Sequence, residues 1–193
     1  MKTIILQTIQ ILHSITDRDM RIIPLIVNTD SVIIVEGLHA LNPVLRPKGL
    51  DENLIFKLYV SPLLPLNLDD HNRIPTSYLR LLRRTVRDYE TRGSSVQHTL
   101  SMWDSVRRGE KLWIFPFQEN SDAIFNSAHI FELPVLKYYA EPLLRRIAPN
   151  SPAYTEATRI LKFLSYIVEL SPQEIAAIPP TSILREFIAG QTL

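Results

Sequence analysis

The stretch from Arg80 to Gly93 reads RLLRRTVRDYETRG and predicts a helix with two separate faces. One face would be an apolar stripe that recurs at helical spacing and consists of Leu79, Leu82, Val86 and Tyr89. The other would be a stripe of arginines, well away from the first, made of Arg80, Arg83, Arg84 and Arg87. Gly93 follows where helices commonly end in a left-handed residue.

The arginine stripe has two interpretations. Like charges three and four residues apart repel, so the helix would be more stable with an anion against it. Guanidinium groups are forked, permanently charged donors that match phosphate oxygens. Asp88 and Glu90, however, lie close enough in sequence to Arg84 and Arg87 to neutralise part of the stripe. Many charged helix faces are simply solvated, so the pattern alone leaves both interpretations open.

The composition limits the class of protein. A chain of 193 residues with 46% hydrophobic and 21% charged residues fits one domain with a substantial core. A net charge of +1 and an arginine stripe without interleaved aromatics argue against nucleic acid as a partner. The lack of cysteine excludes disulfides and thiolate catalysis. No apolar run approaches the roughly 20 residues of a membrane span, so we expect no membrane partner and a cytoplasmic location.

Three apolar segments are candidate strands. They are residues 31–36 before Gly37, residues 54–60, and residues 122–126. Helices are expected at the amino terminus around Ile5 to Leu12, at 95–108 with Gly109 as the stop, and at 133–147, 153–168 and 181–188. Strands mixed with helices in this order predict an α/β protein with a mostly parallel sheet. Prolines near 149–152 suggest a boundary between a core, 1–150, and a helical extension, 151–193.

Two further features are candidate binding residues. Glu36 comes where the first expected strand ends, and a carboxylate at such a strand end can hold Mg²⁺. The alternative is that Glu36 caps a helix or pairs with an arginine. Arg107 and Arg108 form a second basic cluster, expected at a helix end, where the helix dipole by itself favours cations. Together with the first stripe they could face one polyanion such as a triphosphate.

Several motifs, taken in order, carry a resemblance to a known family. Residues 35–39 (VEGLH), 56–60 (FKLYV) and 83–88 (RRTVRD), with Arg92-Gly93, resemble segments of the uridine kinase and phosphoribulokinase-like P-loop kinases. Later segments resemble a bacterial uridine kinase-like branch: 67–74 (NLDDHNRI), 105–110 (SVRRGE), 114–118 (IFPFQ), 125–128 (FNSA) and 182–187 (SILREF). The resemblance runs from about residue 31 to the carboxyl terminus, whereas residues 1–30 do not look like the family.

The resemblance implies a fold and an activity. The fold would be a partial P-loop kinase-type parallel sheet with flanking helices, an arginine-rich lid helix and a helical carboxyl-terminal extension. The reaction would move the γ-phosphoryl group of ATP to the 5′-hydroxyl of a nucleoside. The residues implied to take part in catalysis are Arg84, Arg87 and Arg92. Glu36 matches the glutamate that the family associates with the metal, so it would hold Mg²⁺. Together with the arginine stripe and the second basic cluster, we expect ATP to be bound by Glu36, Arg83, Arg107 and Arg108.

One family element is absent from the sequence. The phosphate-binding loop Gly-x-x-x-x-Gly-Lys-Ser/Thr does not occur, and the five glycines are not clustered. We therefore expect the chain to correspond to the carboxyl-terminal part of a kinase and to be inactive alone. The partners would be nucleoside and nucleotide, together with a second copy or a missing amino-terminal half. An exposed apolar surface is expected where the absent strands pack. The alternative is a non-catalytic module, derived from a kinase, that binds a nucleotide or a protein.

Overall fold

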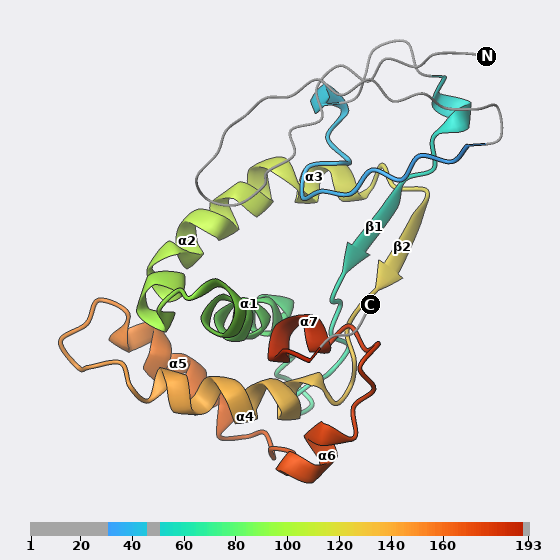
Figure 1. Cartoon of the computed structure of the whole chain (residues 1–193). Coiled ribbons are helices and arrows are strands. Elements are labelled where there is room, and N and C mark those ends of the chain that lie inside the picture. The colour runs from blue at the N-terminus through green and yellow to red at the C-terminus, as the bar shows by residue number, and fades with distance from the viewer. Residues whose placement is uncertain (1–30, 46–50, 191–193) are drawn as a thin grey trace.

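A computed structural model describes residues 31–45 and 51–190 of the chain. These residues form a mixed α/β structure with a small parallel sheet and several helices (Figure 1). The strands are β1 (Leu58–Ser61) and β2 (Ala123–Asn126). The helices are α1 (Thr76–Arg92), α2 (Val96–Trp113), α3 (Phe115–Gln118), α4 (Glu132–Leu144), α5 (Tyr154–Leu164), α6 (Pro172–Ala176) and α7 (Arg185–Ile188). None of the helices in these ranges has the length and apolar character needed to cross a bilayer.

The sheet consists of β1 and β2 side by side and parallel, with Leu58 opposite Ala123 and Ser61 opposite Asn126. Side-chain hydrogen bonds hold both ends of the strand pair together. Asp122 accepts a 2.6 Å hydrogen bond from the Lys57 amide at one end. At the other end, the Asn126 side chain accepts from the Leu63 amide and donates to the Leu63 carbonyl, both at 2.8 Å. The strand expected at 122–126 is therefore confirmed.

The sheet leaves apolar side chains in solvent. Leu58, Val60, Ile124 and Phe125 are 49%, 52%, 57% and 56% exposed. Parallel sheets in globular proteins are usually covered on both faces, and a two-stranded sheet is marginal by itself. Within the described residues, the sheet therefore leaves apolar surface exposed.

The strand expected at residues 31–36 is not formed. The segment is extended and solvent-exposed, with Val32 and Ile34 almost fully accessible, and no described strand pairs with it. An apolar, β-branched run becomes a strand only where a neighbouring strand completes its hydrogen bonds. The strand expected at 54–60 begins only at Leu58, because Glu52–Leu54 form a 3₁₀ turn capped by Asp51.

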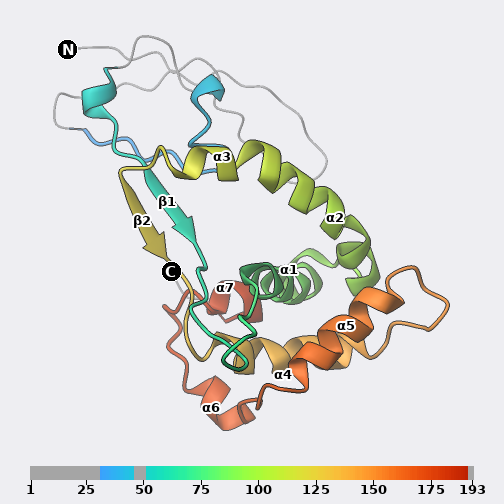
Figure 2. The same cartoon turned by 180° about the vertical axis from the view of Figure 1, so that it is seen from behind.

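The core is helical and is centred on α1. Figures 1 and 2 show α1 with α4 and α7 beside it, and α1 also packs against α2. Leu79, Leu82 and Val86 are buried as expected, and Leu81 joins them. Tyr89 is the exception in the predicted apolar stripe, since it is 41% exposed. Helix α5 packs on α4 and contributes to the same apolar core.

The ends of α1 and α2 can be compared with the helix ends that the sequence predicts. Gly93 ends α1 in the left-handed region at φ 62°, as expected, and Ser95 caps α2 by accepting a hydrogen bond from the His98 amide. Gly109 does not end α2, which continues to Trp113. A helix tolerates an interior glycine at a cost of about 1 kcal/mol. The buried Glu110 carboxylate, 2.6 Å from Arg80 Nη2, holds this part of α2 against α1.

The carboxyl-terminal helices are shorter than expected. The segments predicted at 133–147, 153–168 and 181–188 end as helices at Leu144, Leu164 and Ile188, and the last begins only at Arg185. Helix α6 was not expected. It begins with a capping box in which Ser171 and Glu174 bond each other's backbone amides. The amphipathic helix expected around Ile5 to Leu12 lies outside the described residues.

Candidate functional site

Arg83 lies in the interior of the protein. Its Nη2 donates to Glu132 Oε2 at 2.8 Å and to the Ser127 carbonyl at 2.7 Å, and its Nε donates to the other Glu132 oxygen. Glu132 is fully buried at the start of α4. The guanidinium also lies over the Phe187 ring, 4.8 Å from its centroid. Because the planar guanidinium group of Arg83 donates to both oxygens of the Glu132 carboxylate, the pair holds α1 against α4.

This placement corrects the expected arrangement of α1. Arg83 does not belong to a solvent-facing stripe remote from the apolar one, because it is 7% exposed and packed among core helices. The reason is the unpredicted partner Glu132, which lies 49 residues further along the chain. The Arg83 donors that we expected to bind ATP instead form hydrogen bonds within the protein.

The three arginines expected to take part in catalysis converge on Asp88. Its Oδ2 lies 3.2 Å from Arg84 Nε, and its Oδ1 lies 3.3 Å from Arg92 Nη1 and 3.8 Å from Arg87 Nε. Thr99 Oγ1 of α2 donates to Asp88 at 3.4 Å. Asp88 is only 5% exposed. We call Arg84, Arg87, Arg92 and Asp88 the Asp88 cluster.

The Asp88 cluster carries an excess of positive charge. Three guanidinium groups meet Asp88 and one further carboxylate, Glu186 of α7, whose Oε1 lies 3.4 Å from Arg87 Nη1. Half of the Arg92 side chain and a third of the Arg84 side chain face solvent. Donors on these two residues can therefore reach an anion outside the protein while Asp88 holds their stems in place.

Arg87 is the most constrained arginine of the Asp88 cluster. Its Nε is buried and makes no hydrogen bond, and its guanidinium lies 5.9 Å from the centroid of the Phe187 ring. Burial, and after it the charge of Arg92, lower the pKa of the Arg87 guanidinium below its usual value. The charge nevertheless remains at neutral pH, because an arginine pKa starts so high. Arg87 is thus a fixed and incompletely compensated cation.

The structure does not bring the other predicted residues to the Asp88 cluster. Glu36 is exposed, and its segment runs past α3 near the ends where the strands begin, whereas α1 and α7 lie toward the ends where they finish (Figures 1 and 2). Arg107 and Arg108 are exposed within α2. They lie eight and nine residues beyond Thr99, roughly 12 Å along the helix axis. No group of three metal-ligating side chains occurs in the part of the chain that the structure describes.

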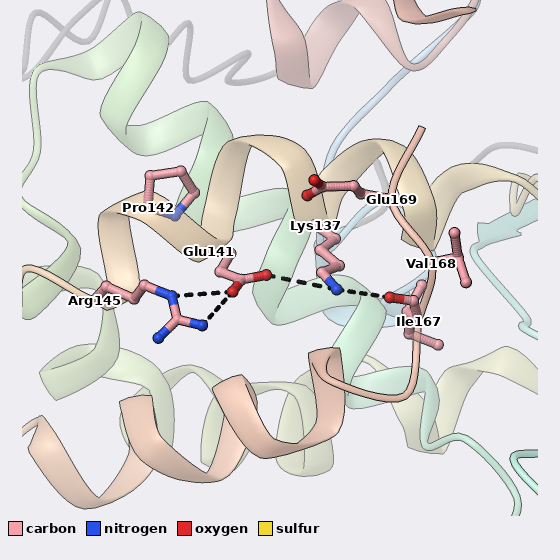
Figure 3. Close-up of a pocket in the computed structure, with 7 residues that line it drawn as sticks. All are labelled: Lys137, Glu141, Pro142, Arg145, Ile167, Val168 and Glu169. Atoms are coloured by element: carbon pink, nitrogen blue, oxygen red, sulfur yellow. Dashed lines mark hydrogen bonds and ion pairs between the residues drawn. The ribbon is translucent and has the colours of Figure 1, made fainter. Parts of the chain in front are cut away.

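A hollow elsewhere on the surface has little capacity for an ionic ligand. It has a volume of about 620 Å³ and lies between α4 and the segment Ile167–Glu169 (Figure 3). Lys137 Nζ donates to the Ile167 carbonyl at 2.7 Å and pairs with Glu141 at 3.6 Å. Arg145 pairs with the same Glu141. The two basic residues are thus already partnered, and no arginine of the Asp88 cluster lines this hollow.

Sequence reasoning missed the residues that organise the arginine helix. Glu132, Glu186 and Phe187 all contact arginines of α1. The available signal was that Ser182–Phe187 forms one of the segments that resemble the uridine kinase-like branch. No family model matches this chain, and neither do any curated proteins or solved structures.

Proposed function

We propose that this chain is the lid-bearing, carboxyl-terminal part of a uridine kinase-like nucleoside kinase. A segment outside these 193 residues would supply the glycine-rich phosphate-binding loop. The complete enzyme would transfer the γ-phosphoryl group of ATP to the 5′-hydroxyl of a nucleoside in the cytoplasm. The single observation that carries the proposal is the Asp88 cluster, where one buried carboxylate gathers three arginines on one helix.

The Asp88 cluster suits phosphoryl transfer on physical grounds. Such reactions depend on positioning and on cations placed where negative charge spreads over the transferred group. Donors held in advance stabilise that charge without reorganising during the reaction. Asp88 and Phe187 position the arginines before any ligand binds. Part of the Arg84 and Arg92 side chains remains in solvent. In this proposal Arg83 anchors the helix, and Arg84, Arg87 and Arg92 meet the phosphates.

The exposed apolar side chains of β1 and β2 support the proposal that a second segment completes the sheet. A further parallel strand could pair with the edge of β1 that no described strand occupies, and could bring residues 31–36 into the sheet. Glu36 would then follow a strand end, as the resemblance implies. Mg²⁺ in such sites binds one or two carboxylates together with substrate phosphates. Glu36 could therefore provide one ligand, with the phosphates and water as the others.

The proposal predicts no phosphorylation by the chain alone. Purified chain with ATP, Mg²⁺ and uridine should form no uridine 5′-monophosphate, because nothing positions the β- and γ-phosphates. The chain joined to the amino-terminal, loop-bearing half of a uridine kinase should form it. The measurement is chromatographic detection of the nucleotide, with adenosine and cytidine as parallel acceptors. Product from the chain alone, or none from any completed form that folds, would contradict the proposal.

The exposed sheet also favours a second candidate, a non-catalytic module that binds a protein through β1 and β2. This candidate does not require free arginine donors. Replacement of Arg87 by alanine would then leave partner binding unchanged, whereas a kinase lid would lose its function.

A further inference from the structure

We infer that Glu186 is a built-in counter-ion of Arg87 that a phosphate-bearing ligand must displace in order to bind the Asp88 cluster. The inference rests on the proposed function and deepens it, because it assigns a competitor to the same site. The ligand class is a polyphosphate anion.

The contact between Glu186 and Arg87 is suited to exchange. Its 3.4 Å separation is long for a charged pair, and nearly half of the Glu186 side chain faces solvent. Exposed ion pairs contribute little stability. A polyphosphate carries several charges and can engage more than one guanidinium at once, so it outcompetes one carboxylate for Arg87.

The exchange does not require α7 to unfold. Its neighbours Leu184, Phe187 and Ile188 are buried in the core. Arg185 Nη2 donates to carbonyls in the last residues of α6 and, at 2.6 Å, to that of Ile178 just beyond it. Glu186 is therefore the exposed residue of a firmly held helix, and only its side chain needs to turn away. Phe187 stays beneath Arg83 and Arg87 and keeps the Arg87 guanidinium in position.

The test measures the affinity of the whole chain for tripolyphosphate by calorimetry at low ionic strength. Glu186→Gln keeps the shape of the side chain and removes its charge, and it should tighten binding about two- to fivefold. Glu156→Gln is the matched control. It removes the same charge from an ion pair on α5, with Arg159, and should leave the affinity unchanged. In an Arg87→Ala background, Glu186→Gln should have no effect.

The outcomes separate this inference from the proposed function. If Arg87→Ala weakens binding but Glu186→Gln matches the unaltered chain, Glu186 is not a competitor and the inference fails alone. The inference would also fail if Glu156→Gln tightened tripolyphosphate binding equally, or if Glu186→Gln still tightened it in the Arg87→Ala background. The change in affinity would then reflect the net charge of the protein. If the chain and all variants fail to bind tripolyphosphate, both the inference and the arginine assignment fail.

Discussion

Replacement of Glu132 by glutamine should lower the free energy of unfolding by about 3 to 5 kcal/mol. Glu132 is fully buried and accepts two hydrogen bonds from Arg83, whose side chain is almost as inaccessible. Glutamine preserves the shape of the side chain but leaves the guanidinium charge buried without a counter-charge. The glutamine amide oxygen could still accept one hydrogen bond from Arg83, but the second hydrogen bond and the opposite charge between α1 and α4 would be lost. Urea denaturation followed by circular dichroism measures the change.

Two controls show whether the loss comes from the buried pair. Glu141→Gln removes a carboxylate from the more exposed pairs with Lys137 and Arg145 and should cost about 0 to 1 kcal/mol. Replacing Arg83 and Glu132 together by methionine and leucine should recover much of the loss, because no unpaired charge remains. If Glu132→Gln costs no more than Glu141→Gln, the pair does not anchor α1.

In the completed kinase, Arg87→Ala should lower kcat about 10²- to 10³-fold. Arg87 is fixed by Phe187, lies close to Asp88, and has no hydrogen bond at Nε, so its charge is incompletely compensated within the protein. Its removal takes away a cation that would stabilise the charge on the transferred phosphoryl group. The cost to stability should be small, about 1 kcal/mol, because its ion pair with Glu186 is partly exposed. Steady-state kinetics and a thermal melt of the same sample measure both effects.

The matched control for this prediction is Arg145→Ala. Arg145 also pairs with a carboxylate, but it directly follows the end of α4 and lies outside the Asp88 cluster. Its removal should leave kcat unchanged. The opposite result would be a large loss of stability in Arg87→Ala with an unchanged kcat for the fraction that remains folded. That result would show that the arginine is structural and would remove the basis for the lid.

Features of α1 that depend on near neighbours could be predicted from the sequence. Its apolar residues fix one face, and Gly93 fixes its end, because both signals act within a few residues. The difference between Arg83 and Arg84 could not be predicted. The two are adjacent in sequence, yet one is buried against Glu132 and the other lies partly in solvent beside Asp88. A partner 49 residues away decides which arginine is enclosed.

The errors at residues 31–36 and at Gly109 have the same physical cause. Both expectations were based on the local preference of the residues for strand or helix, whereas contacts with distant residues determine the secondary structure at these positions. Residues 31–36 have the composition of a strand, but they join no sheet among the residues that the structure describes. Gly109 has a poor preference for helix, but Glu110 pairs with Arg80 of α1, and α2 continues. Helix-stop and strand signals in a sequence are thus conditional on what packs beside them.

The central claim is that this chain is one part of a kinase whose parallel sheet is completed by a loop-bearing segment. Amide hydrogen exchange at Val32–Val35 tests that claim most directly, with the amides paired between β1 and β2 as an internal reference. In the chain alone we expect Val32–Val35 to exchange nearly as fast as unfolded peptide, since no strand within residues 31–45 and 51–190 pairs with them. In the active, completed protein they should become protected to the level of the reference amides. Protection already present in the chain alone, or fast exchange that persists in an active completed enzyme, would contradict the account.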